Sequence, residues 1–327
     1  MRHAAAASIA AAAFLAGAAA PPGWHPVGGG TATHPPETVR TGAAPAWRPV
    51  PVRGAPDPSE VVKAAPAAAW RDVDPENLLV IDLKEGGRIL IELAPAFAPV
   101  HVANVRAFAR GGWWNGASVY RVQDNYVAQW GNNEAKIPFP KAVVAKPPAE
   151  YARPLAGLKP RPLGYPDSYA PAVGHADGWP VGYDPRAGQA WLTHCYGYVG
   201  VGRDLAPDTG SGGELYAVIG HAPRHLDLNI ALIGRVIEGM PLLSARPRGT
   251  GKLGFYEREE QNIGIARARI ASDIPAGERP HYQVLRSDSH AFADYVKGRA
   301  NRGGDFFQRP AGGVDLCNAP VPVRKAP

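Results

Sequence analysis

The chain has 327 residues, with 35 Lys and Arg against 29 Asp and Glu and a formal net charge of +6. The basic residues are interleaved with acidic ones along the sequence, which argues against a nucleic-acid-binding protein. Gly (38) and Pro (35) are abundant, but together they stay just under the roughly 25 to 30% that is typical of a disordered chain.

Residues 1–20 have the pattern of a secretory signal peptide. Arg2 is followed by an Ala-rich apolar run through Phe14 and Leu15, which ends in small residues before Pro21 and Pro22. This run is shorter than the roughly 20 residues that cross a membrane, and no later stretch approaches that length. We therefore expect an exported protein without a membrane span, in the periplasm if the source is Gram-negative.

Residues 21–75 are rich in Pro and Ala and have few periodic apolar positions, so we expect an extended, mobile leader. The remaining 250 or so residues suit one elaborated domain. We place that domain at residues 76–275 and a C-terminal extension at 276–327. The two cysteines, Cys195 and Cys317, are compatible with a disulfide in an oxidising compartment, and a buried free thiol at Cys195 is the alternative.

The domain begins with two strands and a helix. Residues 78–83 and 88–93 are two β-rich runs joined by the turn Lys84 to Gly87, which predicts a β-hairpin. Every second apolar residue would point to the same side, namely Leu79, Ile81 and Leu83, then Ile89, Ile91 and Leu93. Pro99 then suits a first helical position, and apolar residues recur at helical spacing until Gly111.

The stretch Ser118 to Asn132 predicts two short strands around a polar turn. This arrangement would aim Arg121, Tyr126 and Gln129 at one surface. A buried arginine needs an oxygen atom to bind, because it stays protonated in proteins. The alternative is a strand arginine that extends its charged end into water.

Residues 132–190 show no sustained periodicity, and Pro and Gly recur every few residues. We expect a long surface insertion that carries short local elements or covers part of a binding face. After it the sequence predicts further strands at 195–203, 214–220, 230–236 and 263–271, a short helix through Ala245, and helical spacing at 289–300.

This order of elements and several local motifs resemble the cyclophilins, which are β-barrel peptidyl-prolyl cis-trans isomerases. The matching segments are the helix APVHVANVRAFAR (98–110), VYR with YVAQWG (119–121 and 126–131), Gly197 to Arg203, Gly212 to Ala217, and HLD with IGRVIEG (225–227 and 233–239). The resemblance covers roughly residues 78–274. It implies a mainly β fold: a closed cyclophilin-like β-barrel with flanking helices, to which this chain adds the long loop insertion and the C-terminal extension.

The resemblance also implies a site. Arg121 takes the place of the catalytic arginine, and Gln129 that of the glutamine which holds the substrate backbone. The other implied substrate-binding positions are Tyr120, Tyr126, Val127, Gly202, Tyr216, Leu226 and Ile230. The chain departs from the family pattern in that Tyr126 and Tyr216 replace phenylalanines, Glu214 replaces a glutamine, His225 stands where an aromatic residue is common, and Ile230 replaces a histidine.

Rotation about an Xaa-Pro bond breaks amide resonance without making or cutting a bond, so it needs no nucleophile, metal or cofactor. We expect none here. Other motifs are weaker. Pro223 interrupts the His221 and His225 pair as a metal site, Gly249 to Lys252 lacks the rest of a phosphate-binding loop, and no nucleophile elbow surrounds Ser118 or Ser211.

The sequence thus predicts an exported peptidyl-prolyl cis-trans isomerase that assists protein folding. Its expected partners are proline-containing peptides and unfolded exported proteins, and the absence of repeats or coiled coils favours a monomer. The alternative is a peptide-binding or chaperone-like module with little isomerase activity, suggested by Glu214, Ile230 and the insertion.

Overall fold

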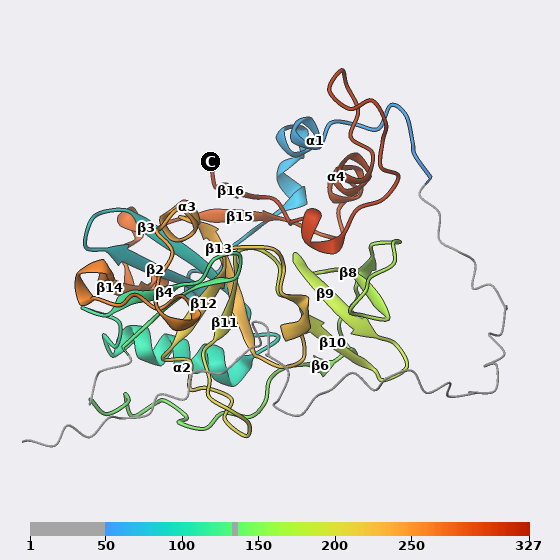
Figure 1. Ribbon diagram of the computed structural model, residues 1–327. Helices are drawn as coiled ribbons and strands as arrows, with labels where there is room; N and C mark the ends of the chain where they lie inside the picture. The colour runs from blue at the N-terminus through green and yellow to red at the C-terminus, as the bar shows by residue number, and fades with distance from the viewer. Residues whose placement is uncertain (1–49, 133–136) are drawn as a thin grey trace, which may run out of the picture. The chain divides into compact units, whose positions relative to one another are not determined.

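The computed structural model describes residues 50–132 and 137–327. The predicted signal peptide and residues 21–49 of the predicted leader lie outside this range. Eight antiparallel strands form a closed barrel in the order β11-β12-β5-β4-β14-β2-β3-β13 (Figure 1). Their bounds are β2 Leu78–Leu83, β3 Arg88–Leu93, β4 Ser118–Val122, β5 Val127–Gly131, β11 Tyr198–Val201, β12 Leu215–Val218, β13 Leu232–Glu238 and β14 Ile263–Ile270. The predicted closed, mainly β fold is confirmed.

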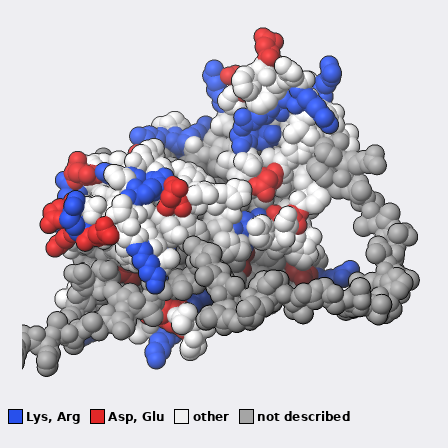
Figure 2. All heavy atoms as spheres, in the orientation of Figure 1, with Lys and Arg blue, Asp and Glu red and all other residues white. Residues whose placement is uncertain are grey.

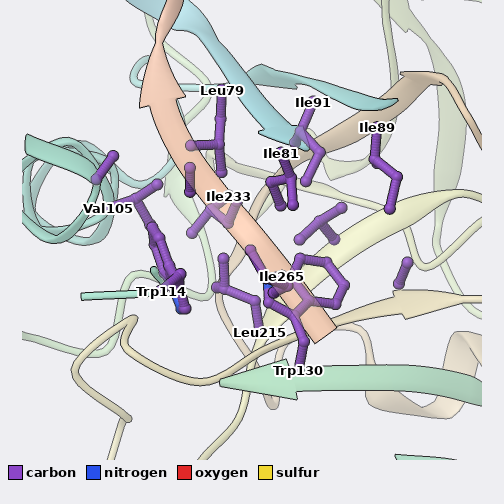
Figure 3. Packing of buried hydrophobic residues seen from close by; sticks show 14 of the residues in the cluster. Leu79, Ile81, Ile89, Ile91, Val105, Trp114, Trp130, Leu215, Ile233 and Ile265 are labelled. Carbon is purple, nitrogen blue, oxygen red and sulfur yellow. The ribbon is translucent and has the colours of Figure 1, made fainter. Parts of the chain in front are cut away.

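The barrel interior is filled by the alternating apolar residues of these strands. Leu79 and Ile81 of β2 meet Ile89 and Ile91 of β3, and Figure 3 shows their side chains converging with those of neighbouring strands. Helix α2 (Pro99–Arg110) packs Val102, Val105 and Phe108 against the same core and ends at Gly111. The predicted hairpin and helix are therefore present, and a short α3 (Pro241–Ser244) follows β13.

The hairpin of β4 and β5 is held by its turn. Asn125 has a positive φ of 49°, and its side-chain oxygen accepts a hydrogen bond from the His221 amide at 2.7 Å. A Cβ at Gly220 would lie 2.1 Å from the Asn125 carbonyl carbon, so only glycine fits there. A register shift between Val119 and Arg121 marks a bulge in β4, which re-aims the side chains at this point.

The insertion forms a five-stranded sheet, in the order β6-β10-β9-β8-β7. Its strands are β6 Arg153–Pro154, β7 Arg161–Pro162, β8 Ala172–Ala176, β9 Trp179–Asp184 and β10 Gln189–Leu192. We expected short local elements here, and the structure joins them into a sheet. Trp179 and Val181 of this sheet lie in an apolar cluster together with Tyr198 and Leu232 of the barrel strands. The strands lacked a periodic signal because β8 and β9 are buried at nearly every position instead of at alternate ones.

The expectation of a mobile leader up to residue 75 differs from the structure. Helix α1 (Pro58–Ala64) is capped by Asp57, and β1 (Trp70–Asp72) pairs with β15 (Tyr282–Leu285) in a three-stranded sheet with β16 (Val323–Lys325). These segments are ordered because Trp70 and Val73 pack against Val284 and Phe292, more than 200 residues away in the sequence.

The C-terminal extension contains the predicted helix as α4 (His290–Ala300), with Ser289 as its N-cap. Short 3₁₀ helices are η1 Ala67–Ala69, η2 Pro75–Asn77, η3 Arg224–Leu226, η4 Lys252–Gly254, η5 Glu259–Gln261, η6 Ala271–Asp273, η7 Ala276–Glu278 and η8 Leu316–Asn318. Cys195 and Cys317 form a disulfide with their Cα atoms 5.1 Å apart, which decides between the two alternatives left open by the sequence.

Two further expectations concern the distribution of charge on the surface and a membrane span. Figure 2 shows basic and acidic side chains on the same face of the protein, in keeping with their interleaving along the sequence. Within residues 50–132 and 137–327, no helix combines the length and the apolar character that crossing a membrane requires.

Candidate active site

The candidate site lies on the outer face of the barrel, across β4, β5 and β12. Arg121 pairs with Gln129 in the strand register, and Gln129 pairs with Tyr216. Residues directly opposite each other on neighbouring strands point to the same face of a sheet. Ala128 and Trp130, the neighbours of Gln129, point instead into the barrel core. The three predicted residues therefore form one row on the outer face.

Arg121 is held in place by three hydrogen bonds. Its Nε donates to the Leu253 carbonyl at 2.8 Å, Nη1 donates to Gln129 Oε1 at 2.8 Å, and Nη2 donates to the side chain of Gln123. The guanidinium group also lies 5.4 Å from the centre of the Phe255 ring. A guanidinium has five N–H groups, so two remain without a partner among the described residues.

The charge of Arg121 is partly removed from water. Burial lowers the pKa of Arg121 from its ordinary value, while nearby tyrosines raise it. Arginine nevertheless stays protonated in proteins. Its two remaining donors are therefore strong ones, because a hydrogen bond from a charged group gains strength in a partly dry site.

Gln129 is oriented by a second set of hydrogen bonds. Its Nε2 donates to the Tyr120 hydroxyl at 2.7 Å, and that hydroxyl donates to the Glu214 carboxylate. The amide thus has its oxygen toward Arg121 and its nitrogen toward Tyr120. Gly202 lies beside it, since a Cβ at Gly202 would come within 3.3 Å of Gln129 Nε2. The second amide hydrogen of Gln129 is left for a substrate carbonyl.

Burial also shifts the pKa values of Glu214 and Tyr120. It raises the pKa of Glu214 to about 7, although the hydrogen bond from Tyr120 opposes the shift. Burial and the neighbouring Glu214 charge raise the pKa of Tyr120, which keeps the phenol protonated. Glu214 therefore titrates near neutral pH, close to the residues that hold Gln129.

A compact apolar cluster adjoins the row of Arg121 and Gln129. It brings together all the apolar pocket residues that the sequence predicted, namely Tyr126, Val127, Tyr216, Leu226 and Ile230, and adds Val218. Tyr126 is half-buried and its ring lies parallel to that of His225, with centroids 6.4 Å apart. Such a floor suits an apolar ring of the size of proline.

The structure adds residues that sequence reasoning did not single out. Phe255 stacks on Tyr120 with ring centroids 5.8 Å apart, and η4 supplies the Leu253 carbonyl for Arg121. His194 is fully buried and lies 3.0 Å from the Tyr216 hydroxyl. The glycines at 249 and 251 were the available signal for η4, and they mark the loop that bends back onto Arg121.

Within the described residues, no group of three or more His, Cys, Asp and Glu side chains is arranged to hold a metal ion.

Comparisons with known proteins concern the family and the fold. A family model described as "Cyclophilin type peptidyl-prolyl cis-trans isomerase/CLD" matches residues 78–270. Two curated relatives, each called "Probable peptidyl-prolyl cis-trans isomerase", from Brucella suis and Brucella melitensis, are 41% identical over 59 residues, which is 18% of this chain and 30% of theirs. The chain thus spans less than a third of the length of these relatives.

Among solved structures, the crystal structure of the cyclophilin AquaCyp293 from Hirschia baltica is similar with a TM-score of 0.61. The similarity covers 79% of this chain and 94% of that chain at 24% sequence identity. At this identity the likeness concerns the fold. Because it extends over most of both chains, it includes more than the barrel strands matched by the family model.

Proposed function

Because this chain belongs to the cyclophilin-type peptidyl-prolyl cis-trans isomerase family, whose model matches more than half of it, we propose that it accelerates the isomerisation of Xaa-Pro bonds. The observation that carries this proposal is the row of Arg121, Gln129 and Tyr216 beside one apolar cluster. Proline-containing segments of unfolded exported proteins are the proposed substrates.

The mechanism follows from the barrier. Rotation about the bond is opposed by amide resonance, about 18 to 20 kcal/mol, and the twisted transition state places a lone pair on the prolyl nitrogen. A donor that binds this nitrogen or the adjacent carbonyl more strongly in the twisted state lowers the barrier. Arg121 offers its remaining N–H groups for this role, and no atom of the substrate needs to be transferred.

Gln129 and the apolar cluster hold the two sides of the bond differently. The free amide hydrogen of Gln129 can bind a backbone carbonyl of the peptide, while the cluster around Val127 and Leu226 holds the proline ring still. Rotation is then confined to the remaining side of the bond, which favours the twisted geometry over the planar one.

Export is supported by two independent features. The first 20 residues have the signal-peptide pattern, and the disulfide between Cys195 and Cys317 is of a kind that persists in oxidising compartments. We propose a location outside the cytoplasm, which is the periplasm if the source is Gram-negative. Uncatalysed isomerisation takes tens of seconds or more, during which an exported chain is exposed to aggregation.

The test follows cis-to-trans exchange of a short Xaa-Pro peptide by NMR exchange spectroscopy. We expect the wild type to accelerate exchange and Arg121→Ala to lower kcat/KM by about 10² to 10³-fold, the range found when a single transition-state donor is removed. The control is Arg88→Ala, which removes a strand arginine that pairs with Asp82 on β2 and lies outside the site.

Two results would contradict the proposal in different ways. A wild-type rate equal to that of buffer would reject the isomerase activity and leave a peptide-binding module. An Arg121→Ala rate equal to the wild-type rate would keep the activity and reject the assignment of Arg121.

A further inference from the structure

The Tyr216 ring borders the apolar cluster but carries a hydroxyl group that the cluster cannot satisfy. The residue is only 5% exposed. A Cβ at Gly200 on the adjacent strand would collide with the end of the ring, so the ring lies across the bare backbone of β11. A buried hydroxyl without a hydrogen-bond partner is unfavourable, because it loses its hydrogen bonds to water.

His194 provides the partner. Its Nε2 lies 3.0 Å from the Tyr216 hydroxyl, and the two rings are nearly parallel, at 15°. Both the backbone N–H and Nδ1 of His194 lie 2.9 Å from Asp227 Oδ1. Because a carboxylate accepts hydrogen bonds, the proton of a neutral His194 is on Nδ1, and Nε2 accepts the hydroxyl proton of Tyr216. Burial lowers the pKa of His194, in keeping with a neutral ring.

Asp227 is in turn connected to the insertion. Its second oxygen accepts from Arg224 Nε, and the Arg224 nitrogens Nη1 and Nη2 donate to the two oxygens of Asp167 at 2.9 and 3.1 Å. The side chains of Arg224 and Asp167 are each only 3% exposed. Tyr169 covers the Arg224 guanidinium at 5.3 Å. One arginine thus lies between two buried carboxylates.

We propose that Asp167, Arg224, Asp227 and His194, hereafter the Tyr216 network, hold the Tyr216 hydroxyl away from the proline pocket so that the ring presents an apolar face to substrate. These are positioning residues, and Asp167 makes the insertion part of the substrate-binding machinery. The inference rests on the proposed function. It also accounts for a tyrosine at a position where the cyclophilin resemblance implies phenylalanine.

The kinetic test is a double-mutant cycle between His194→Leu and Tyr216→Phe. His194→Leu removes the acceptor at similar volume, which leaves the hydroxyl free to turn toward the pocket. We expect KM for an Xaa-Pro peptide to rise fivefold or more with kcat within twofold. In the Tyr216→Phe background, where no hydroxyl remains, the same change should leave KM within twofold of that of the Tyr216→Phe single variant. A purely structural role of His194 would raise KM equally in both backgrounds.

Asp167→Asn tests the contribution of the insertion, because it removes the charge of the carboxylate that pairs with Arg224. We expect a smaller rise in KM, about twofold to threefold, that disappears in the Tyr216→Phe background. The matched control is Asp184→Asn, since Asp184 lies in the same insertion but only caps the turn at Arg186 and Ala187. Its KM should equal that of the wild type.

A spectroscopic measurement keeps the inference testable if a variant does not fold. The ¹⁵N shifts of the His194 ring in the wild type should show a neutral imidazole protonated at Nδ1. A proton on Nε2 would overturn the inference, as would an unchanged KM in His194→Leu or an equal rise in KM on His194→Leu in the wild-type and Tyr216→Phe backgrounds. If the wild type does not catalyse exchange, the proposed function fails, and peptide Kd values across the same variants decide the inference.

Discussion

At the scale of single residues, the site depends on a directed set of hydrogen bonds. The Tyr120 hydroxyl donates to Glu214 and accepts from Gln129, so the Gln129 oxygen is left to accept from Arg121. Glu214 sets the direction of these hydrogen bonds, because an ionised carboxylate can only accept. A protonated Glu214 could instead donate to Tyr120 and compete with Gln129 for its oxygen. The position of Arg121 is therefore coupled to the charge of Glu214.

This coupling predicts a pH dependence. Since burial raises the pKa of Glu214 to about 7, we expect kcat/KM to rise as pH increases through this value. The other groups that face the carboxylate are the Tyr120 phenol, which stays protonated, and the backbone N–H of Asn132. Glu214→Gln should give a flat profile near the high-pH level, because the glutamine oxygen accepts from Tyr120 at every pH. An unchanged profile in Glu214→Gln would contradict the assignment.

The contribution of Glu214 to the free energy of unfolding changes with pH in the direction opposite to that of kcat/KM. Its pKa in the folded state lies above the ordinary value of 4.5, so the folded state binds the proton more tightly than the unfolded state does. This contribution is fully present below about pH 4.5 and is lost as pH rises to about 7. Urea unfolding of the wild type and of Glu214→Gln across this range checks the sign. Falling stability together with rising activity would be difficult to attribute to any other single group.

At the scale of elements, the sequence predicted best those segments whose signal is local. The strands at 78–83 and 88–93 and the helix start at Pro99 were recovered because alternation, turn residues and a fixed proline φ act over a few residues. Strands β8 and β9 escaped prediction because they are buried on both faces. The order of β1 depends on pairing with β15, so no property of residues 70–72 alone could reveal it.

The same distinction applies to the site. Arg121 and Gln129 lie eight residues apart on one hairpin, and the family resemblance located both. His194 and Asp227 come together from positions 33 residues apart, and Asp167 joins them from within the insertion. Asp227 belongs to the HLD motif, but neither that motif nor the sequence around His194 and Asp167 indicates these contacts, since the role of each residue follows from the buried partner that it meets. The fold and the proximity of Arg121, Gln129 and Tyr216 were thus predictable, whereas the hydrogen bonds that reach the Tyr216 hydroxyl were not.

The buried ion pair of Glu92 and Arg235 connects several secondary-structure elements. Glu92 on β3 accepts from Arg235 on β13 at 2.7 Å and from Arg71 on β1 at 2.7 Å. Arg235 also donates to the Gly178 carbonyl at 2.8 Å and lies 4.5 Å from the centre of the Trp179 ring. Glu92 and Arg235 are 3% and 5% exposed. The pair therefore connects the barrel, the insertion and the strand β1.

We expect Glu92→Gln to lower the free energy of unfolding by about 3 to 5 kcal/mol, because it leaves the Arg235 charge buried without a counter-charge. The control is Asp288→Asn, which breaks an exposed pair with Arg286 and should change stability by less than about 1 kcal/mol. Urea denaturation measures both. Equal midpoints for Glu92→Gln and the wild type would show that uncharged groups around Arg235, among them Gly178, Trp179 and Tyr198, satisfy its charge.

At the scale of the whole molecule, the additions to the barrel are tied back to it by contacts from distant parts of the chain. The cluster around Trp70, Val284 and Phe292 covers Leu78, Val80 and Leu90, which belong to barrel strands but point away from the barrel interior. Phe292 of α4 also meets His175 of the insertion, with ring centroids 4.8 Å apart. Residues 61–73, the insertion and the C-terminal extension therefore share one packed structure with the barrel.

The disulfide is a covalent link between the barrel side of the molecule and the C-terminal extension. It joins Cys195, next to His194 of the Tyr216 network, to Cys317 in η8, across 122 residues. Closing a loop of this length restricts the unfolded chain, so its loss should lower the free energy of unfolding by about 2 to 5 kcal/mol. We expect dithiothreitol to shift the urea midpoint downward by the corresponding amount. Because the chain has only these two cysteines, the double variant Cys195→Ala with Cys317→Ala should show the lower midpoint with or without reductant. A wild-type midpoint that does not respond to reduction would mean that the packing around Phe292 and His175 holds the C-terminal extension without the covalent bond.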